Sequence, residues 1–273
     1  MVSLHHTYRV REPAVAGVFY PKEPGALARQ VTDLLNNAMS APRHGVRGVI
    51  APHAGYVYSG AIAAEAFGCL RDSLHRFRRA VVIGPSHYVR FTGLAAPSQG
   101  AFATPMGLVP IDREAIEALV SEGLAAIDDA PHGPDHAVEV ELPFLQAVFG
   151  AMAIVPLLFG ETSAAHVANA IRRLWDDDTL LVVSSDLSHY EPYDLATAHD
   201  TRTATAIEGF DQAAIGPFEA CGHMAIRGML LEAQDRGYSI ERLDLRNSGD
   251  TSGDRQRVVG YGAWAIGQLE PSN

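Results

Sequence analysis

Residues 80–88, AVVIGPSHY, carry the pattern that decides the fold. An unbroken run of small and branched apolar residues predicts a short strand buried on both faces, and a turn with proline, serine and histidine follows it at once. The same order of features returns at residues 49–56, VIAPHAGY, and at residues 180–190, LLVVSSDLSHY. Such strands are typical of a parallel or mixed sheet covered by helices on both faces.

Helical patterns fill the stretches between these strands. Asp112 and Asp135 are expected to cap helices, and Gly237 is expected to end one. No linker, repeat or low-complexity segment interrupts the pattern, so we expect one α/β domain over residues 1–273. The expected helices span residues 24–39, 59–70, 113–124, 136–149, 163–175 and 221–236. Further strands are expected at residues 152–158 and 257–266, and Pro156 indicates an edge or irregular position for the first of them. Residues 247–254 are expected to form a polar loop.

Composition excludes several classes of protein. The formal net charge of −11 disfavours nucleic acid and anionic membranes as partners, and the basic stretch at residues 71–79, RDSLHRFRR, is the best candidate for a local exception. Lys22 is the only lysine and follows no glycine, so a phosphate loop is absent and Schiff-base chemistry would rest on Lys22 alone. The N-terminus lacks an apolar signal core, and the longest apolar run, residues 147–160, is too short to span a bilayer. We therefore expect a cytoplasmic protein with reduced thiols.

The turns after the three strands hold the candidate chemistry. In parallel sheets ligands bind beyond the carboxyl ends of the strands, so His53, His87, Asp186 and His189 are expected to meet at one rim. His53 and His87 lie 87 − 53 = 34 residues apart, about one βαβ repeat, which predicts neighbouring strands. A single such histidine is more often a hydrogen-bonded structural residue, but three on three strand ends favour a shared site.

Two further side chains extend this set. Cys221 lies where a helix begins, and the positive end of the helix dipole is expected to lower the thiol pKa and favour the thiolate that binds metals. The alternative is that Cys221 is a small apolar side chain packed in the core, which is the role we expect for Cys69. His136 is the first residue of the helix expected at residues 136–149 and is a candidate for the same site. The alternative is a structural residue next to the N-cap of that helix. We expect His223 to point elsewhere and the remaining histidines to lie on the surface, namely His5, His6, His44, His75, His132, His166 and His199.

Seven segments in one order resemble the Memo family (mediator of ErbB2-driven cell motility), which includes the B protein of the AmmeMemoRadiSam system. They are REPAVAGVFYP (11–21), APHAGYVYSG (51–60), VVIGPSHY (81–88), DHAVEVELPFL (135–145), VSSDLSHY (183–190), ACGH (220–223) and GYGAWAIG (260–267). Each is weak alone, but their shared order is specific. The family pattern HSxExxLPF departs at Ala137, which replaces a serine.

The resemblance implies a fold like that of class III extradiol dioxygenases, which are non-haem iron enzymes. It implies a metal site of two histidines and a cysteine, namely His53, His87 and Cys221, in place of the two histidines and glutamate of the dioxygenases. His136, Asp186 and His189 match the other polar motifs of the family pocket and are expected to be catalytic. The resemblance also implies a radical-SAM partner for bacterial and archaeal members.

These residues predict an open metal centre with redox or dioxygenase-like activity on a small molecule. Two imidazoles and a thiolate suit Fe(II), our first expectation, and also Cu or Zn. His136 and His189 would move protons, and Asp186 would orient one of them. The alternatives are a non-catalytic module that binds metal and a peptide or partner protein in the cleft, and a zinc hydrolase with His189 as base. A serine hydrolase is disfavoured because the motif G-x-S-x-G is absent. Gly260, Gly262 and Ala265 match the dinucleotide-binding pattern G-x-G-x-x-A, but too few residues follow for a phosphate-binding helix, so we expect them to be strand residues.

Overall fold

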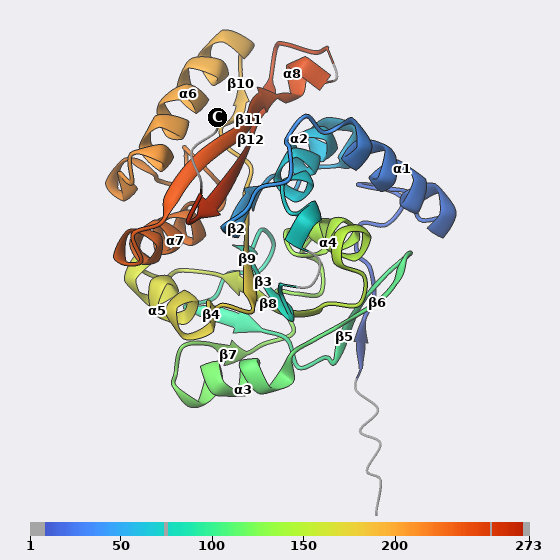
Figure 1. The fold of residues 1–273 in the computed structure, drawn as a ribbon, viewed down its shortest axis with the longest axis vertical. Helices are drawn as coiled ribbons and strands as arrows, with labels where there is room; N and C mark the ends of the chain where they lie inside the picture. The colour runs from blue at the N-terminus through green and yellow to red at the C-terminus, as the bar shows by residue number, and fades with distance from the viewer. Residues whose placement is uncertain (1–8, 74–75, 252, 270–273) are drawn as a thin grey trace, which may run out of the picture.

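The computed structural model describes residues 9–73, 76–251 and 253–269 (Figure 1). Its central sheet has nine strands in the order β10-β12-β2-β9-β3-β8-β4-β7, with β11 paired to β12. The strands are β2 (Val46–Ala51), β3 (Arg79–Pro85), β4 (Leu94–Ala96), β7 (Ala126–Ile127), β8 (Ala153–Phe159), β9 (Thr179–Ser184), β10 (His189–Glu191), β11 (Ser239–Asn247) and β12 (Val258–Gly267). A separate three-stranded sheet joins β1 (Val10–Arg11), β5 (Ala101–Thr104) and β6 (Gly107–Pro110).

Strands β2, β9, β3 and β8 run parallel and form the buried middle of the sheet. Every residue of β3 and of β9 is buried, which explains why their sequences are continuously apolar rather than alternating. The outer pairings, β12 with β2 and β4 with β8, are antiparallel. The expected mixed sheet is therefore confirmed.

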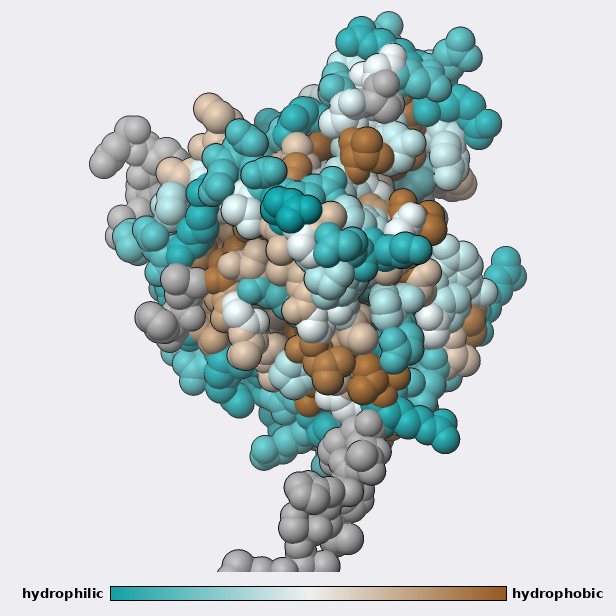
Figure 2. All heavy atoms as spheres, turned by 90° about the vertical axis from the view of Figure 1, so that its right-hand side faces the viewer, coloured by the Kyte–Doolittle hydropathy of each residue, from teal (hydrophilic) through white to brown (hydrophobic). Residues whose placement is uncertain are grey.

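Helices cover both faces of this sheet (Figure 1). Helices α1 (Pro24–Asn37), α2 (Tyr56–Gly68) and α4 (Leu142–Phe149) lie on one side, and α5 (Ala164–Leu174), α6 (Tyr193–Glu208) and α7 (His223–Asp235) lie on the other. Helix α3 (Arg113–Ser121) packs near β8, and α8 (Ser248–Thr251) is a single short turn. Seen from the α1 side, the surface is mainly hydrophilic or neutral, with hydrophobic residues in a few patches (Figure 2).

Two sequence-based assignments differ from the structure for an identifiable reason. The helix expected over residues 136–149 begins at Leu142, because the Asp135 carboxylate accepts hydrogen bonds from the backbone nitrogens of Ala137 and His87 and folds residues 135–138 into a turn. The loop expected at residues 247–254 contains α8, which begins beside Asn247, whose side chain accepts from Gly249 N.

The order of the strands also differs from expectation. Strands β2 and β3 are not neighbours, because β9 lies between them and pairs with both. Strand β8 is interior, and its register with β3 is regular through Pro156, so the expected edge or irregular position is wrong. Proline is tolerated there because β4, on the other side of β8, pairs with Leu158 and Phe159 but not with Pro156.

The remaining expectations concern the surface. Arg79 is buried and pairs with Asp112 and Asp176, so it cannot belong to a basic patch at residues 71–79. Within the part of the chain that the structure describes, no helix has both the length and the apolar composition that a bilayer crossing requires.

Candidate metal centre

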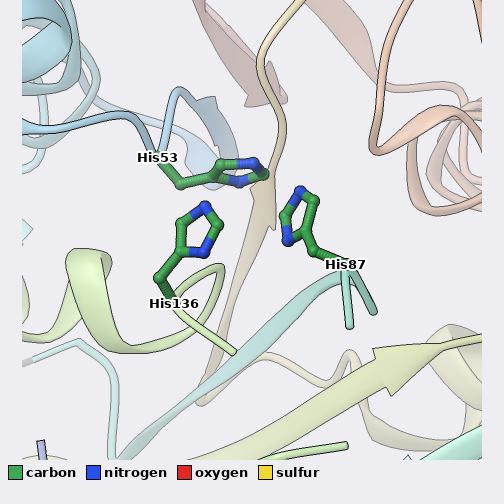
Figure 3. Close-up of side chains that lie close together, drawn as sticks. All are labelled: His53, His87 and His136. Atoms are coloured by element: carbon green, nitrogen blue, oxygen red, sulfur yellow. The ribbon is translucent and has the colours of Figure 1, made fainter. Parts of the chain in front are cut away.

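Three imidazoles meet beyond the carboxyl ends of the central strands. His53 follows β2, His87 follows β3, and His136 lies in the turn before α4 (Figure 3). One ring nitrogen from each lies within 4.8 Å of the others. The ring centroids are 5.1 Å apart for His53 and His87, 5.3 Å for His53 and His136, and 4.5 Å for the stacked pair His87 and His136. This spacing is compatible with one bound cation.

His53 is almost fully buried, and its surroundings select one tautomer. Its Nδ1 lies 2.7 Å from Ser184 Oγ, and the Ser184 hydroxyl donates to the carbonyl oxygen of Ala137 at 2.6 Å. Because the single hydroxyl proton is used there, Nδ1–H of His53 is the donor to Ser184 Oγ. The lone pair is then on Nε2, which faces the centre. Burial lowers the pKa of His53 well below its ordinary value, so the ring is neutral.

His87 is held by Asp135 through two contacts. The Asp135 carboxylate accepts from the backbone nitrogen of His87 at 2.6 Å and lies 3.1 Å from its Nδ1. Burial raises the pKa of Asp135, but hydrogen bonds from His87 and from Ala137 N outweigh it and lower that pKa to about 2. An ionised carboxylate only accepts, so Nδ1 of His87 carries the proton and Nε2 is available to a ligand.

His136 completes the cluster from the side of α4. Its ring stacks on His87 and contacts the ring of Phe19, with centroids 4.7 Å apart. Its Nδ1 is buried and has no hydrogen-bond partner among the described residues. Burial, and then the neighbouring His53 and His87, lower the pKa of His136 to about 4. The sequence predicted a proton carrier here, and the structure places a neutral nitrogen within the histidine cluster.

Cys221 lies just before α7 and contacts the cluster through His53. Its Sγ is 3.3 Å from His53 Nε2 and also accepts from the backbone nitrogen of Asp186 at 3.3 Å. The expected low thiol pKa is wrong for the protein alone, because burial and the nearby Asp186 raise the pKa of Cys221. Without a neighbouring cation the protonated thiol is therefore the favoured form.

The two other expected catalytic residues lie at different depths. Asp186 is buried, its pKa is raised by burial, and its Oδ1 accepts from the backbone nitrogen of His53 at 2.9 Å. It therefore positions His53. His189 is exposed in β10 and packs edge-on against Tyr190, which has a φ of 60° at an irregularity in the pairing of β10 with β12. Such a conformation is costly for a non-glycine residue and is common at binding sites.

A cleft of about 900 Å³ opens above the three histidines. Its wall is rich in aromatic side chains, and Arg257 is its one lysine or arginine among the described residues. The lining comprises Val18, Phe19, His53, Ala54, Gly55, Val57, Tyr58, His87, Tyr88, His136, Asp186, His189, Tyr190, Ser248, Asp254, Arg257, Val259 and Tyr261. The expected meeting of His53, His87, Asp186 and His189 at one rim is therefore observed.

Sequence reasoning missed Asp135 and Ser184 as the residues that orient the two ligand histidines. The position of Asp135 before His136 in the DHAV motif was the available signal, but it was interpreted as a helix cap. His132 is another error, since it is buried with its Nε2 donating to the Ala95 carbonyl at 3.0 Å.

The other assignments follow the sequence more closely. Cys69 is buried, as expected, and Gly260, Gly262 and Ala265 belong to β12. His44 is exposed; His166 and His199 are half-buried, His166 near the Leu124 carbonyl and His199 between Glu191 and Glu219. His223 begins α7 and lines a different cavity. His5, His6 and His75 lie outside the described residues.

Comparisons with known proteins point to one family. A family model described as "Memo-like protein" matches residues 11–265. A MEMO1 family protein of Methanothermobacter thermautotrophicus is 35% identical over an alignment that covers 92% of this chain and 98% of that protein. One of Thermotoga maritima is 33% identical, with 92% and 97% covered. The crystal structure of an uncharacterized protein from Escherichia coli K12 matches with a TM-score of 0.54 at 15% identity, covering 80% of this chain and 98% of that chain, which shows a shared fold.

Proposed function

Because the chain belongs to the Memo-like family, we propose that it is a metal-dependent oxidoreductase in which His53, His87 and Cys221 hold Fe(II) at the floor of the cleft. The observation that carries this proposal is the cluster of three imidazoles with Cys221 Sγ 3.3 Å from His53 Nε2. Cu and Zn are the alternative ions for this ligand set. When bound, such an ion supplies redox or Lewis-acid chemistry to a molecule in the cleft.

The residues present fit a cation by three independent signs. Ser184 and Asp135 each occupy Nδ1 of one histidine, which leaves both Nε2 lone pairs free. His136 Nδ1 is buried without a hydrogen-bond partner, a costly arrangement that a neighbouring cation would relieve. The half-buried Cys221 thiol has a raised pKa, which a bound cation would lower.

The cleft supports a small oxidisable aromatic molecule as substrate. Tyr58, Tyr88 and Tyr190 are exposed at its mouth, where a flat ring can stack on them. His189 is exposed in the same cleft, where its imidazole can pass a proton to or from a bound molecule. Asp186 fixes the backbone of His53 and so keeps the ring on the cleft floor.

The first test is metal content. Untagged protein purified without oxygen is analysed by mass spectrometry for iron, copper and zinc, alongside His53→Ala, His87→Ala and Cys221→Ser. We expect about one ion per wild-type chain and its loss from each variant, while His44→Ala, at an exposed histidine, keeps it. Iron that persists in Cys221→Ser and His53→Ala would reject the ligand assignment.

His136→Ala distinguishes two ligand sets. If it abolishes metal binding while Cys221→Ser retains it, the ligands are the three histidines and not the predicted set. The reaction is tested by oxygen uptake with catechols in the iron-loaded protein. Activity with zinc but not iron on an ester or amide would replace an oxidoreductase by a zinc hydrolase.

A binding module is the second candidate, favoured by the apolar rim of the cleft. Val18 and Val57 are 80% and 67% exposed beside the tyrosines, which suits a peptide or partner protein. Stoichiometric binding of a partner, unchanged in His53→Ala and Cys221→Ser, would favour this function over catalysis.

A further inference from the structure

A second cavity of about 640 Å³ adjoins the centre from a different direction. It also opens at the carboxyl ends of the sheet, but beside β3 and β8 and the start of α7. Its lining comprises Pro85, Ser86, Val89, Arg90, Phe91, Phe159, Gly160, Glu161, Thr162, Cys221, His223 and Met224. No described residue lines both this cavity and the histidine cleft.

The partition between the two cavities is thin. In the turn after β3, His87 and Tyr88 line the cleft, whereas Ser86, Val89 and Arg90 line the second cavity. The Ser86 hydroxyl donates to the Val89 carbonyl at 2.7 Å and so braces this turn.

The second part of the partition is formed by the contacts of Cys221 with His53 and with the backbone nitrogen of Asp186, both of which line the cleft. Cys221 belongs to the wall of the second cavity, and His53, 3.3 Å from its Sγ, belongs to the wall of the cleft. A molecule in the second cavity would therefore approach the centre from behind the histidines.

We propose that the second cavity is a separate entrance through which a small uncharged molecule, of the size of O2 or hydrogen peroxide, reaches Cys221 without passing through the histidine cleft. Its wall combines one guanidinium, Arg90, and one carboxylate, Glu161, with the apolar Phe91, Phe159 and Met224. These charges balance, so the cavity has no formal preference for ions. If the proposed oxidoreductase is correct, the two entrances separate the organic substrate from the oxidant.

The test measures access to the thiol in metal-stripped full-length protein, so it does not depend on the proposed activity. Iodoacetamide is small and uncharged; the Cys221 sulfur displaces iodide, forms a thioether and releases the thiol proton. Peptide mass spectrometry follows modification at pH 8.5, with buried Cys69 as the internal control for unfolding. Thr162→Trp fills the second cavity, and Val57→Trp is the matched change in the cleft.

We expect Thr162→Trp to slow modification of Cys221 by about tenfold, because access limits thiol reactivity, and Val57→Trp to leave the rate within about twofold. Met224→Phe, in the same wall, should also slow the modification of Cys221. It replaces Thr162→Trp if iodoacetamide modifies Cys69 in that variant, since this would show that the variant is unfolded. Equal rates in all variants, slowing by Val57→Trp alone, or a native Cys221 that stays unmodified even as the pH is raised further to increase the thiolate fraction would each overturn the separate entrance.

Discussion

Asp135 is the residue that controls the orientation of His87. Its carboxylate contacts both the backbone nitrogen and Nδ1 of that histidine, and Ala137 N as well. An asparagine keeps one acceptor and turns the other into a donor that faces the Nδ1 proton. We therefore expect Asp135→Asn to weaken metal binding about 10- to 100-fold, measured by titration of the metal-stripped protein. The matched change Asp129→Asn, at an aspartate that accepts from Ser98, should have no such effect; equal affinity in both variants would contradict the role of Asp135.

His132 predicts a pH dependence of stability that is separate from the centre. Its Nε2 donates to Ala95 O, while Nδ1 is buried without a partner among the described residues. Burial lowers the pKa of His132 to about 4 in the folded protein. The pKa of a histidine in the unfolded chain is about 6.5. Between these two pH values His132 is therefore protonated in the unfolded chain and neutral in the folded protein. The free energy of unfolding should therefore fall as the pH drops through this window, by on the order of 3 kcal/mol for this group.

The measurement is urea unfolding at several pH values for wild type and His132→Gln, which keeps a donor to Ala95 but does not titrate. His53 and His136 also have lowered pKa values and add to the wild-type slope, so the difference between the two proteins isolates His132. Parallel stability profiles for the two proteins would show that His132 does not titrate in this window.

At the scale of elements, β12 and α6 together hold the segment that carries Asp186 and His189. Gly260 N donates to the Ser188 carbonyl, and Leu187 N donates to the Gly260 carbonyl, both at 2.8 Å. A β-carbon at Gly260 would lie 2.0 Å from Oδ2 of Asp200, whose Oδ1 accepts from Ser188 N. The glycine is thus required by the close approach of a carboxylate, which explains the first glycine of the G-x-G-x-x-A match in this strand.

Gly260→Ala should therefore lower the free energy of unfolding by about 1–3 kcal/mol, through overpacking against Asp200. The loss should be smaller in an Asp200→Ala background, because the clashing carboxylate is absent. Urea unfolding of both single variants and the double variant gives the coupling energy, with Gly133→Ala as a control at an exposed glycine that has more room. Additive effects would mean that Asp200 does not limit this position.

The central strands and most of the helices were predictable because their signals are local, whereas the long helix α6 and strand β11 were not predicted. Continuous apolar runs marked β3 and β9, and Asp112 and Ser163 cap α3 and α5 through their own side chains. The turn at residues 135–138 was missed because its cause is His87, 48 residues away in sequence. A capping aspartate and an aspartate that orients a distant histidine cannot be told apart by their neighbours in the chain.

At the scale of the whole molecule, strand order was the part that sequence could not provide. The spacing of 34 residues predicted adjacent strands, yet β9 enters between β2 and β3 from more than ninety residues further along the chain. His53 and His87 still meet, because the turns after the strands reach across the end of β9. The raised pKa of Cys221 was equally hidden, since it depends on burial by segments distant in sequence.

The distribution of charge over the whole molecule predicts the class of ligand in the cleft. The chain has a formal net charge of −11, so its surface repels anions in general. Arg257 lines the cleft, has no ion pair among the described residues, and places its guanidinium 5.1 Å from the ring centroid of Tyr190. An aromatic molecule with a carboxylate can stack at the tyrosines and pair with Arg257 at once.

We expect 3,4-dihydroxybenzoate to bind the metal-stripped protein about tenfold more tightly than catechol in dilute buffer, since a hydrogen bond to a charged group contributes about 1.5–3 kcal/mol. Salt at about 1 M, where the Debye length is about 3 Å, should reduce this preference. Calorimetric titration of Arg257→Gln should show equal affinities for the two ligands, whereas Arg255→Gln, whose guanidinium lies over Tyr193 outside the cleft lining, should keep the preference. A preference that survives in Arg257→Gln would mean that another group selects the carboxylate.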